Sequence, residues 1–339
     1  MPIRQDSATP SDYALLAGNG NMPLAESVAK RLGTSLASGI MKKFADGEIR
    51  CEFKQDDVAG KHCYILQPTC RPVNDNFMEL VTMVSACRRA GALSVTVLSP
   101  YYGYARQDRG QKGKAVPITS GDVSQILEFM GVSRIITVDL HSLQTTGMVS
   151  AKVQFEDYEG AFAGLDYFLK NIEDKRNLVV VSPDAGGMKR ASSFHKHFQF
   201  HGHNEVGLAM ISKERKAANE VGEVILIGDV TGKQCIVVDD MADTAGTLCA
   251  AADVLKEKGA TDVYAFITHG IFSGPAGDRI AKSQFKKVIT TDSMPLIEGF
   301  AEKAGDKHAQ VSLDLLLAEI IRRTHLREDK LDLHTKPVY

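Results

Sequence analysis

The sequence predicts an α/β protein with two domains, each built on a mainly parallel sheet flanked by helices. A length of 339 residues exceeds what one hydrophobic core usually organises. Short apolar, β-branched runs alternate with segments of helical period, which is the pattern of βαβ units in parallel sheets. The predicted strands are residues 64–66, 95–98, 135–138, 178–181, 236–238 and 263–267.

Three segments repeat apolar residues at the i, i+3, i+4, i+7 spacing of an amphipathic helix. They cover residues 77–84, 123–130 and 313–321. The first follows Asn74 and Asp75 and the second follows Ser120, and these residue types are common N-caps. Periodicity is lost near residues 150–157, which predicts one domain over 1–154, joined by the segment 316–339, and a second over 155–315.

The composition argues against several functional classes. With 40 basic and 42 acidic residues the net charge is −2, so no global positive field would attract nucleic acid. No apolar run approaches the roughly 18 residues of a membrane span, and the N-terminus lacks a signal-peptide pattern. The six cysteines include no CxxC pair. We therefore expect a reduced, cytoplasmic protein that contacts neither membrane nor nucleic acid.

Polar and small residues directly follow five of the predicted strands. Open parallel sheets bind ligands beyond the carboxyl ends of their strands, so these segments are expected to meet at one crevice. Any one of them could be a helix cap and a turn, but together they predict a site that handles phosphate. The segments are SPYYGYARQDR, DLHS, SPDAGG, DDMADTAGT and THGIFSGP.

The most specific of these segments is CIVVDDMADTAGT at residues 235–247. Its loop can direct backbone N–H groups and threonine hydroxyls at one phosphate, at a helix N-terminus where the dipole favours an anion. Asp239 and Asp240, at the predicted strand tip, can accept hydrogen bonds from the vicinal hydroxyls of a ribose. The alternative is an acidic N-cap followed by a glycine turn. The loop comprises Asp243, Thr244, Ala245, Gly246 and Thr247.

This stretch resembles the phosphoribosyl-binding fingerprint of the type I phosphoribosyltransferase fold. By that resemblance the loop takes the 5-phosphate, and Asp239 and Asp240 take the ribose hydroxyls. Seven further segments resemble the ribose-phosphate pyrophosphokinase (phosphoribosyl pyrophosphate synthetase) family, in order along the chain. They are KKFADGE at 42–48, NDNFMEL at 74–80, YARQDR at 104–109, DLHS at 139–142, SPDAGGMKR at 182–190, ISKERKAANE at 211–220 and THGIFSGPA at 268–276.

The resemblance implies two phosphoribosyltransferase-like domains and a magnesium-dependent transferase. Such an enzyme moves the β,γ-diphosphoryl group of ATP to the 1-hydroxyl of ribose 5-phosphate, giving 5-phosphoribosyl 1-diphosphate and AMP. The first domain would face ATP, and the second would hold ribose 5-phosphate and the catalytic loop. The family also implies a homo-oligomer in which dimers assemble into a hexamer.

For ATP, the family resemblance implies a site that a neighbouring subunit partly supplies. An aromatic face and an arginine plane can sandwich a purine. Without the resemblance, FADGE would be a turn and RQDR a solvated run of charges. The implied ATP residues are Phe44, Asp46, Gly47, Glu48, Arg106, Gln107 and Asp108.

The resemblance also places Mg²⁺ at His141 and Asp184, and a pyrophosphate loop at Asp184, Ala185, Gly186 and Gly187. Mg²⁺ prefers oxygen ligands and keeps several waters, so one carboxylate plus ATP oxygens is a sufficient set. His141 could instead act through water, on an ATP phosphate, or as a core hydrogen-bonding residue. Lys213 and Arg215 match the family's catalytic pair, where two cations would neutralise charge on the transferred group. An exposed helix face is the alternative for that segment.

Two other features of the sequence leave alternatives open. The chain has no GxxxxGK[ST] motif, and Gly18-Asn19-Gly20 is not continued into GxGxxG, so neither a P-loop kinase nor a dinucleotide enzyme is supported. A histidine cluster could bind a transition metal or form a solvated helix end and loop. It consists of His195, His197, His201 and His203.

Two other functional readings share part of this evidence. A catalytically silent paralogue that associates with active synthetases would commonly carry an interrupted catalytic loop, whereas 211–220 is uninterrupted. A phosphoribosyltransferase acting on a nitrogen base would share 235–247 but not the FADGE, RQD and KERKAANE segments. After His141, and in RGQKGKAVP, the chain departs from the family pattern, which leaves allosteric control by phosphate and ADP in doubt.

Overall fold

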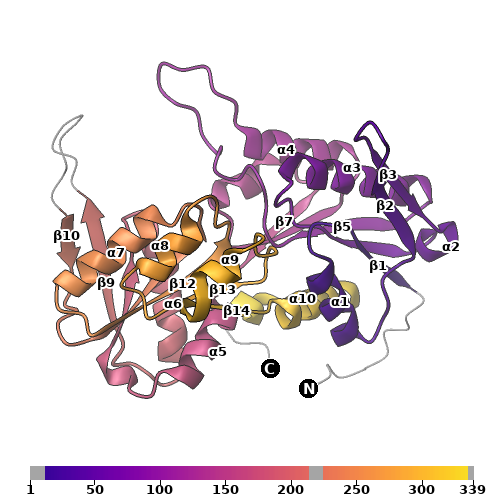
Figure 1. The fold of residues 1–339 in the computed structure, drawn as a ribbon. Coiled ribbons are helices and arrows are strands. Elements are labelled where there is room, and N and C mark those ends of the chain that lie inside the picture. Colours follow the sequence, from indigo (N-terminus) through magenta and orange to yellow (C-terminus); the bar gives the residue numbers. More distant parts are fainter. Residues whose placement is uncertain (1–11, 214–223, 335–339) are drawn as a thin grey trace. The chain divides into compact units, whose positions relative to one another are not determined.

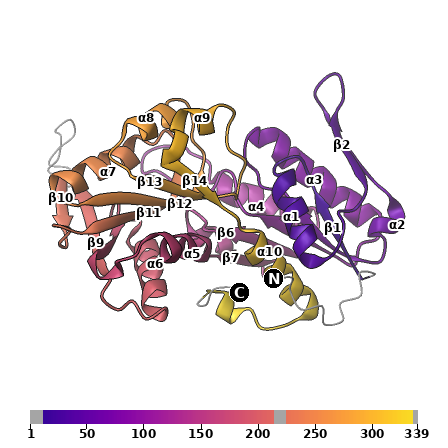
Figure 2. The ribbon, with the colours of Figure 1, turned by 60° about the horizontal axis from the view of Figure 1, so that its bottom comes forward.

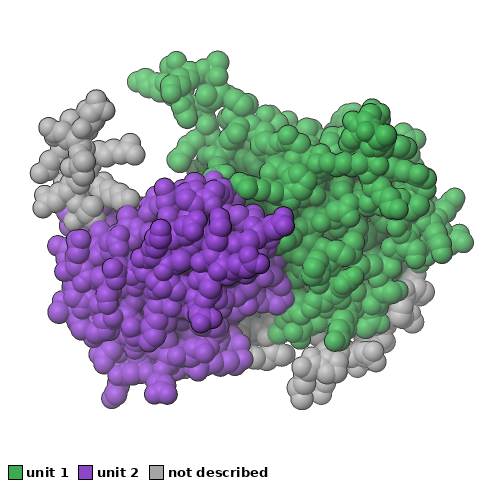
Figure 3. Space-filling view, viewed as in Figure 1, with its two compact units in different colours: residues 1–159, 293–295, 313–339 green, residues 160–292, 296–312 purple. Residues whose placement is uncertain are grey.

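The computed structural model describes residues 12–213 and 224–334, which belong to two compact units (Figure 3). Unit 1 contains residues 1–159, 293–295 and 313–339, and unit 2 contains residues 160–292 and 296–312. Each unit has its own sheet and its own buried core (Figure 1). Over the described ranges, no helix combines the length and the apolar composition of a membrane span.

Unit 1 is built on a parallel sheet whose described strands follow one another in space as β1 (Tyr13–Ala17), β4 (His62–Leu66), β5 (Ser94–Ser99), β6 (Arg134–Val138) and β7 (Gln154–Tyr158). A separate antiparallel hairpin joins β2 (Gly39–Lys43) to β3 (Ile49–Phe53). The helices are α1 (Met22–Leu32), α2 (Gln55–Val58), α3 (Val73–Arg89), α4 (Thr119–Phe129) and α10 (Asp314–Leu326), with 3₁₀ turns at Leu143–Met148 and Leu331–His334.

The C-terminal helix α10 belongs to unit 1 because it packs on α1 through a buried carboxylate. Asp314 accepts a hydrogen bond from Ser27 Oγ at 2.6 Å and lies 2.8 Å from Arg31 Nε. The hydrogen bond between Ser27 and Asp314 joins residues 287 positions apart, so it ties the beginning of unit 1 to its C-terminal segment. They lower the pKa of Asp314 against the opposing effect of burial, so this carboxylate stays ionised while it holds the two helices together.

The predicted helices are present, but two predicted caps are wrong. α3 begins at Val73 after Pro72, and α4 begins at Thr119 after Ile118, with no side-chain cap in either case. Tertiary contacts use the expected capping residues instead. Asn74 accepts from the Tyr104 hydroxyl, and the Ser120 hydroxyl donates to the Gln107 carbonyl at 3.1 Å.

Unit 2 is built on a larger sheet, which is parallel except for its edge strand β10. In spatial order its described strands are β10 (Val224–Ile227), β9 (Gly207–Lys213), β8 (Leu178–Ser182), β11 (Gln234–Ala242), β12 (Asp262–Gly270), β13 (Lys287–Thr291) and β14 (His308–Val311). The helices are α5 (Ala161–Asn171), α6 (Met188–Phe200), α7 (Gly246–Glu257), α8 (Ala276–Lys282) and α9 (Phe300–Ala304), with 3₁₀ turns at Lys175–Asn177 and Gly305–Lys307.

Helices cover both faces of the unit 2 sheet, with α5 and α6 on one side and α7 and α8 on the other (Figure 2). Successive strand residues alternate between the two cores: Val180 packs with α5 and α6, and Val181 packs with α7 and α8. The fit is close on the first side. A Cβ atom on Gly164 of α5 would lie 2.3 Å from the Phe266 ring, so this position requires glycine.

Candidate active site

The two adjacent carboxylates of unit 2 lie inside strand β11, which continues through them to Ala242 rather than ending before them. The strand is longer than its apolar run because β12 is equally long and pairs with it in parallel as far as Gly270. Asp239 pairs with Ile267 of β12, whereas the register with β8 ends at Val237, so the polar end of β11 is held in the sheet by β12. The carboxylates therefore sit on a fixed strand, beyond the carboxyl end of neighbouring β8.

One guanidinium serves both carboxylates. Arg190 Nη1 lies 3.6 Å from Asp239 Oδ1 and 3.4 Å from Asp240 Oδ1. The Asp240 side chain is 6% exposed and the Asp239 side chain 28%. Burial raises the pKa of Asp239 well above its ordinary value, and the neighbouring charge of Asp240 raises it further. The pair thus favours a ligand that donates hydrogen bonds or carries positive charge.

The loop after β11 turns sharply into helix α7. Ala245 has φ 57° and is buried, and helix α7 begins at the next residue, Gly246. The first amides of a helix have no partners within the helix, and an alanine side chain cannot cap them. Arg279 Nη1 donates to the Thr244 carbonyl at 2.9 Å and would lie 3.3 Å from a Cβ on Gly246. The turn thus joins helix amides and a guanidinium, a combination that suits an anion.

The loop after β8 lies at the same edge of the sheet, because β8 and β11 are neighbours. Ser182 Oγ donates to the Asp184 carbonyl at 2.6 Å, and Gly187 N donates to Asp184 Oδ1 at 2.9 Å. These two bonds fix a tight turn before helix α6, while Asp184, Ala185 and Gly186 remain exposed. Arg190, in the first turn of α6, connects this loop to the carboxylates of β11.

In unit 1 the predicted nucleotide residues 44–48 form the tip of the β2–β3 hairpin. Phe44 N donates to Glu48 O at 2.8 Å, Gly47 has φ 96°, and Glu48 N donates to Asp46 Oδ1 at 3.1 Å. The Phe44 ring is 50% exposed, and Arg50 Cζ lies 5.9 Å from its centroid. An exposed aromatic ring beside a guanidinium is a surface on which a purine can stack.

The other predicted nucleotide residues follow strands of the unit 1 sheet. Arg106 and Gln107 are exposed, Asp108 is buried, and Gln107 accepts from the Thr119 hydroxyl at 2.6 Å, which anchors the segment to α4. His141 is exposed, two residues beyond Asp139, whose φ is 48°. The core hydrogen-bonding role considered for His141 therefore does not fit its exposure.

Comparisons with known proteins agree along nearly the whole chain. Residues 13–131 match the model for the N-terminal domain of ribose phosphate pyrophosphokinase, and residues 203–334 match the phosphoribosyl synthetase-associated domain. The ribose-phosphate pyrophosphokinase of Vibrio parahaemolyticus is 44% identical over 315 residues, 92% of this chain and 96% of that protein. That of Xanthomonas axonopodis pv. citri is 41% identical over 320 residues, 94% of this chain and 97% of that protein.

The chain belongs to the ribose-phosphate pyrophosphokinase family. The crystal structure of phosphoribosylpyrophosphate synthetase from Mycobacterium smegmatis superposes with a TM-score of 0.83 at 33% identity, covering 93% of this chain and 99% of that one. The predicted family, the fold class and the assignment to an enzyme class are thereby confirmed. The comparisons give no support to a silent regulatory paralogue.

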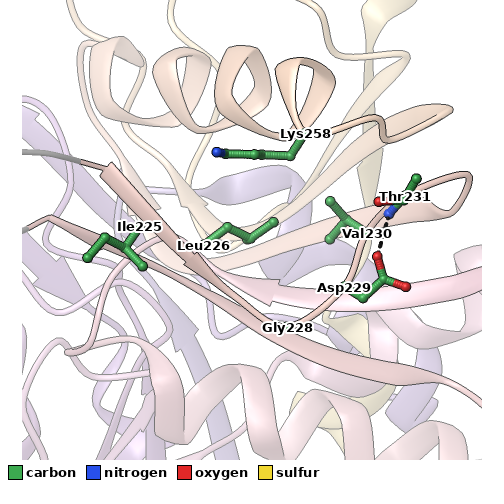
Figure 4. A pocket seen from close by; sticks show the side chains of 7 residues that line it. All are labelled: Ile225, Leu226, Gly228, Asp229, Val230, Thr231 and Lys258. Carbon is green, nitrogen blue, oxygen red and sulfur yellow. Dashed lines mark hydrogen bonds between the residues drawn. The ribbon is translucent and has the colours of Figure 1, made fainter.

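For this pyrophosphokinase-family chain, one member of the proposed catalytic pair, Lys213, lies at the end of β9. Lys213 is the last residue of that strand and pairs through its backbone with Val224 of β10. The Lys213 side chain and the whole of Arg215 lie outside the described residues. Beside β10 is a pocket of about 320 Å³ over which Lys258 extends from the end of α7 (Figure 4). It is lined by Ile225, Leu226, Gly228, Asp229, Val230, Thr231 and Lys258, none of them a predicted site residue.

The histidine cluster in the second half of α6 and in the turn after it is held by individual hydrogen bonds and ring contacts. The His195 ring bonds the Val206 carbonyl at 2.7 Å, and the His201 ring bonds the His197 carbonyl at 2.8 Å. His197 is buried with its ring 4.2 Å from the ring of Phe162. Within the described part of the chain, no three His, Cys, Asp or Glu side chains are grouped as a metal would require.

Two arginines of the candidate site were not assigned roles from the sequence. Arg190 contacts Asp239 and Asp240, and Arg279 holds the Thr244 carbonyl. Arg190 lies within the SPDAGGMKR segment that resembles the family, so a basic residue directly after the predicted pyrophosphate loop is the signal that could have identified it. Arg279 follows the THGIFSGPA segment by three residues and carries no motif of its own.

Proposed function

We propose that this chain is a ribose-phosphate pyrophosphokinase that transfers the β,γ-diphosphoryl group of ATP to the 1-hydroxyl of ribose 5-phosphate. The observation that carries the proposal is the arrangement in unit 2, where paired carboxylates on β11 precede an uncapped helix N-terminus within five residues of sequence. The former suits vicinal hydroxyls and the latter a phosphate, which are the two ends of ribose 5-phosphate.

Ribose 5-phosphate would be bound by residues at both ends of the loop after β11. The amides of Ala245, Gly246 and Thr247 and the threonine hydroxyls would receive its 5-phosphate, with Arg279 steadying the turn through Thr244. Asp239 and Asp240 would accept hydrogen bonds from the 2- and 3-hydroxyls. Because Asp239 and Asp240 share the Arg190 guanidinium, hydrogen bonds donated by the sugar would favour the ionised form of both carboxylates.

The loop Asp184, Ala185, Gly186 and Gly187 would receive the diphosphoryl group at the start of α6. Asp184 fits a Mg²⁺ ligand: its carboxylate is exposed and engages Gly187 N through one oxygen, which leaves lone pairs for a cation. When bound by Asp184 and ATP oxygens, with His141 acting through a water, Mg²⁺ would neutralise phosphate charge. ATP would be held by Phe44, Asp46, Gly47, Glu48, Arg106, Gln107 and Asp108, partly from a neighbouring subunit of a hexamer assembled from dimers.

The reaction would need no nucleophilic side chain. The 1-hydroxyl oxygen forms a bond to the β-phosphorus and loses its proton, while the bond from that phosphorus to the oxygen of the α-phosphate breaks and AMP leaves. Lys213 and Arg215 would neutralise the charge that gathers on the transferred group and on AMP. Holding the hydroxyl in line can contribute about 7–11 kcal/mol, so positioning by β11 and its loop is a large part of catalysis.

Incubation of the purified chain with ATP, ribose 5-phosphate and magnesium tests this proposal. We expect AMP and 5-phosphoribosyl 1-diphosphate in equal amounts. ADP as the product would mean γ-phosphoryl transfer and would contradict the mechanism. Lys213→Ala should lower turnover by orders of magnitude without loss of folding, whereas Lys258→Ala, an exposed lysine at the end of α7, should leave turnover unchanged.

A further inference from the structure

The proposed ATP residues of unit 1 lie on two separate segments, the tip of the β2–β3 hairpin and the turn that contains Arg106 and Gln107. Among the described strands, β2 pairs with β3 alone, and neither strand joins the parallel sheet. A two-stranded hairpin is only marginally stable by itself in water. The position of this hairpin in unit 1 must therefore be set by contacts with neighbouring elements.

The first half of helix α3 supplies these contacts. The helix packs against β3 (Figure 1). Met41 of β2 and Cys51 of β3 are register partners, and both pack on the same hydrophobic core as Phe77 and Val81 of α3. This apolar contact holds the base of the hairpin, but it does not reach the exposed tip that carries residues 44–48.

An ion pair fixes the hairpin closer to its tip. Lys43 Nζ lies 2.5 Å from Asp75 Oδ2, in the first turn of α3. Lys43 directly precedes Phe44, whose exposed ring is proposed to stack on the purine. A change at Asp75 would therefore act one residue away from the stacking ring, without any contact between Asp75 and the nucleotide.

One turn further along α3, the buried carboxylate of Glu79 holds the backbone of the hairpin. Glu79 is 4% exposed and accepts from Asn19 N at 2.8 Å, from Asn19 Nδ2 at 2.6 Å and from Gln67 Nε2 at 3.0 Å. Asn19 Nδ2 also donates to the Met41 carbonyl of β2 at 3.2 Å. Glu79 thus reaches the hairpin through one intermediate side chain. A buried polar network whose members are satisfied is rigid, so this link has one arrangement.

This network gives the Gly18-Asn19-Gly20 segment a structural role. A Cβ atom on Gly18 would lie 2.5 Å from Gln67 Oε1, and Gly20 N donates to that same oxygen at 3.1 Å. The glycines therefore let the backbone approach Gln67 closely. That approach allows Asn19 and Gln67 to donate to the same carboxylate, that of Glu79.

The second ATP segment is tied to the first turn of the same helix. The Tyr104 hydroxyl donates to Asn74 Oδ1. Tyr104 has φ 63°, a left-handed conformation that persists in a non-glycine residue only where its surroundings hold it. The Tyr104 carbonyl accepts from Gln107 N at 2.9 Å, so this residue begins the turn that presents Arg106 and Gln107. The bond to Asn74 therefore fixes the start of that turn.

We propose that the first half of α3 positions both ATP segments of unit 1, through Asn74, Asp75 and Glu79. Each contact by itself is ordinary, but together they join one short stretch of helix to two segments that are far apart in the sequence. These are positioning residues, because they act through other side chains rather than on the nucleotide. The inference rests on the proposed function, which assigns ATP to the two segments.

Exchange of the charges at Lys43 and Asp75 tests the proposal on the full-length protein. The affinity for a non-hydrolysable ATP analogue with Mg²⁺ is measured by titration calorimetry. Lys43→Asp and Asp75→Lys should each weaken binding roughly fivefold, as expected for loss of an exposed ion pair. The double variant restores the pair in the opposite orientation and should recover most of the affinity. Asp166→Lys, which breaks the exposed pair with Lys170 on α5, should leave the affinity unchanged.

Hydrogen exchange without nucleotide reports on the hairpin itself. In Asp75→Lys the amides that pair β2 with β3 should exchange faster, while those of β4 in the same unit stay unchanged. Asn74→Ala and Tyr104→Phe should each weaken analogue binding roughly threefold, with no further loss when combined, because they remove the same hydrogen bond. Glu79→Gln is not used, since its amide would face the donors of Asn19 or Gln67 inside the core and destabilise unit 1.

Several results would overturn the proposal. They are no binding of the analogue by the wild type, unchanged affinity in Asp75→Lys, no recovery in the double variant, and equally faster exchange in β4. In turnover assays Asp75→Lys should raise the KM for ATP and leave the KM for ribose 5-phosphate unchanged, and equal rises would also count against it. Binding and exchange need no turnover. A chain that binds the analogue as expected but forms no AMP would therefore disprove the proposed reaction and leave the positioning role of α3 standing.

Discussion

Replacement of Asp239 by asparagine should stabilise unit 2 at alkaline pH while impairing catalysis. Two carboxylates on β11 share one guanidinium, and burial and Asp240 raise the pKa of Asp239. Asparagine removes one charge but keeps an oxygen that can accept the 2.9 Å hydrogen bond from Asp240 N. Arg190 then serves Asp240 alone.

The expected gain is about 1–2 kcal/mol, a discounted figure because the Asp239 side chain is 28% exposed. For a unit of this size that corresponds to roughly 3–6 °C in melting temperature. The direction of the pH dependence follows from the raised pKa of Asp239. Between its unfolded value near 4 and its folded value, the folded state binds more protons, so wild-type stability falls as pH rises.

Calorimetry of wild type and Asp239→Asn at several pH values is the assay. The stability difference should be near zero at about pH 4 and grow as pH rises. Asp239→Ala, which loses the acceptor for Asp240 N, should be about 1 kcal/mol less stable than the asparagine variant. The reasoning is refuted if Asp239→Asn is less stable than wild type at alkaline pH, or if the difference does not change with pH. Under the proposed function, its KM for ribose 5-phosphate should also rise.

Two further predictions concern unit 2. Burial and Lys287 lower the pKa of His308 to about 4, so stability from this residue is lost as pH falls from about 6.5 towards 4. Replacing His308 by phenylalanine should reduce the stability that is lost over this pH range by about 2 kcal/mol, as measured by unfolding at a series of acid pH values. An equal loss in wild type and variant would exclude His308 as the cause. Arg279→Ala removes the donor to the Thr244 carbonyl, so the KM for ribose 5-phosphate should rise roughly tenfold with the KM for ATP unchanged. Equal changes in both constants would point to general unfolding of the loop.

The sequence predicted those strands whose apolar runs are continuous and buried on both faces. All six predicted runs lie in observed strands, β4, β5, β6, β8, β11 and β12. The strands that were not predicted include the edge strands β1, β7, β10 and β14 of the two sheets, which are short. Edge strands are buried less completely, so their sequences carry a weaker apolar pattern.

Helix caps were predicted less well than helical periodicity, because a side chain that can cap a helix can instead bond a residue far away in the sequence. Asn74, Asp75 and Ser120 are good N-caps in isolation. In the fold, Asn74 accepts from Tyr104, Asp75 pairs with Lys43, and Ser120 donates to the Gln107 carbonyl. These partners lie 13–32 residues away, so a local pattern cannot reveal them.

The difference between local patterns and distant partners also explains which parts of the candidate site could be predicted from the sequence. Asp239, Asp240 and the loop that follows them are contiguous, so one stretch of sequence contains the whole cradle. Their counter-ion, Arg190, is 50 residues from Asp240 and reaches it because β8 and β11 are neighbours in the sheet. A motif therefore shows where negative charge gathers, whereas strand order decides which cation meets it. Since that cation sets how much charge is left for a ligand to satisfy, the affinity of the cradle depends on topology as much as on its own residues.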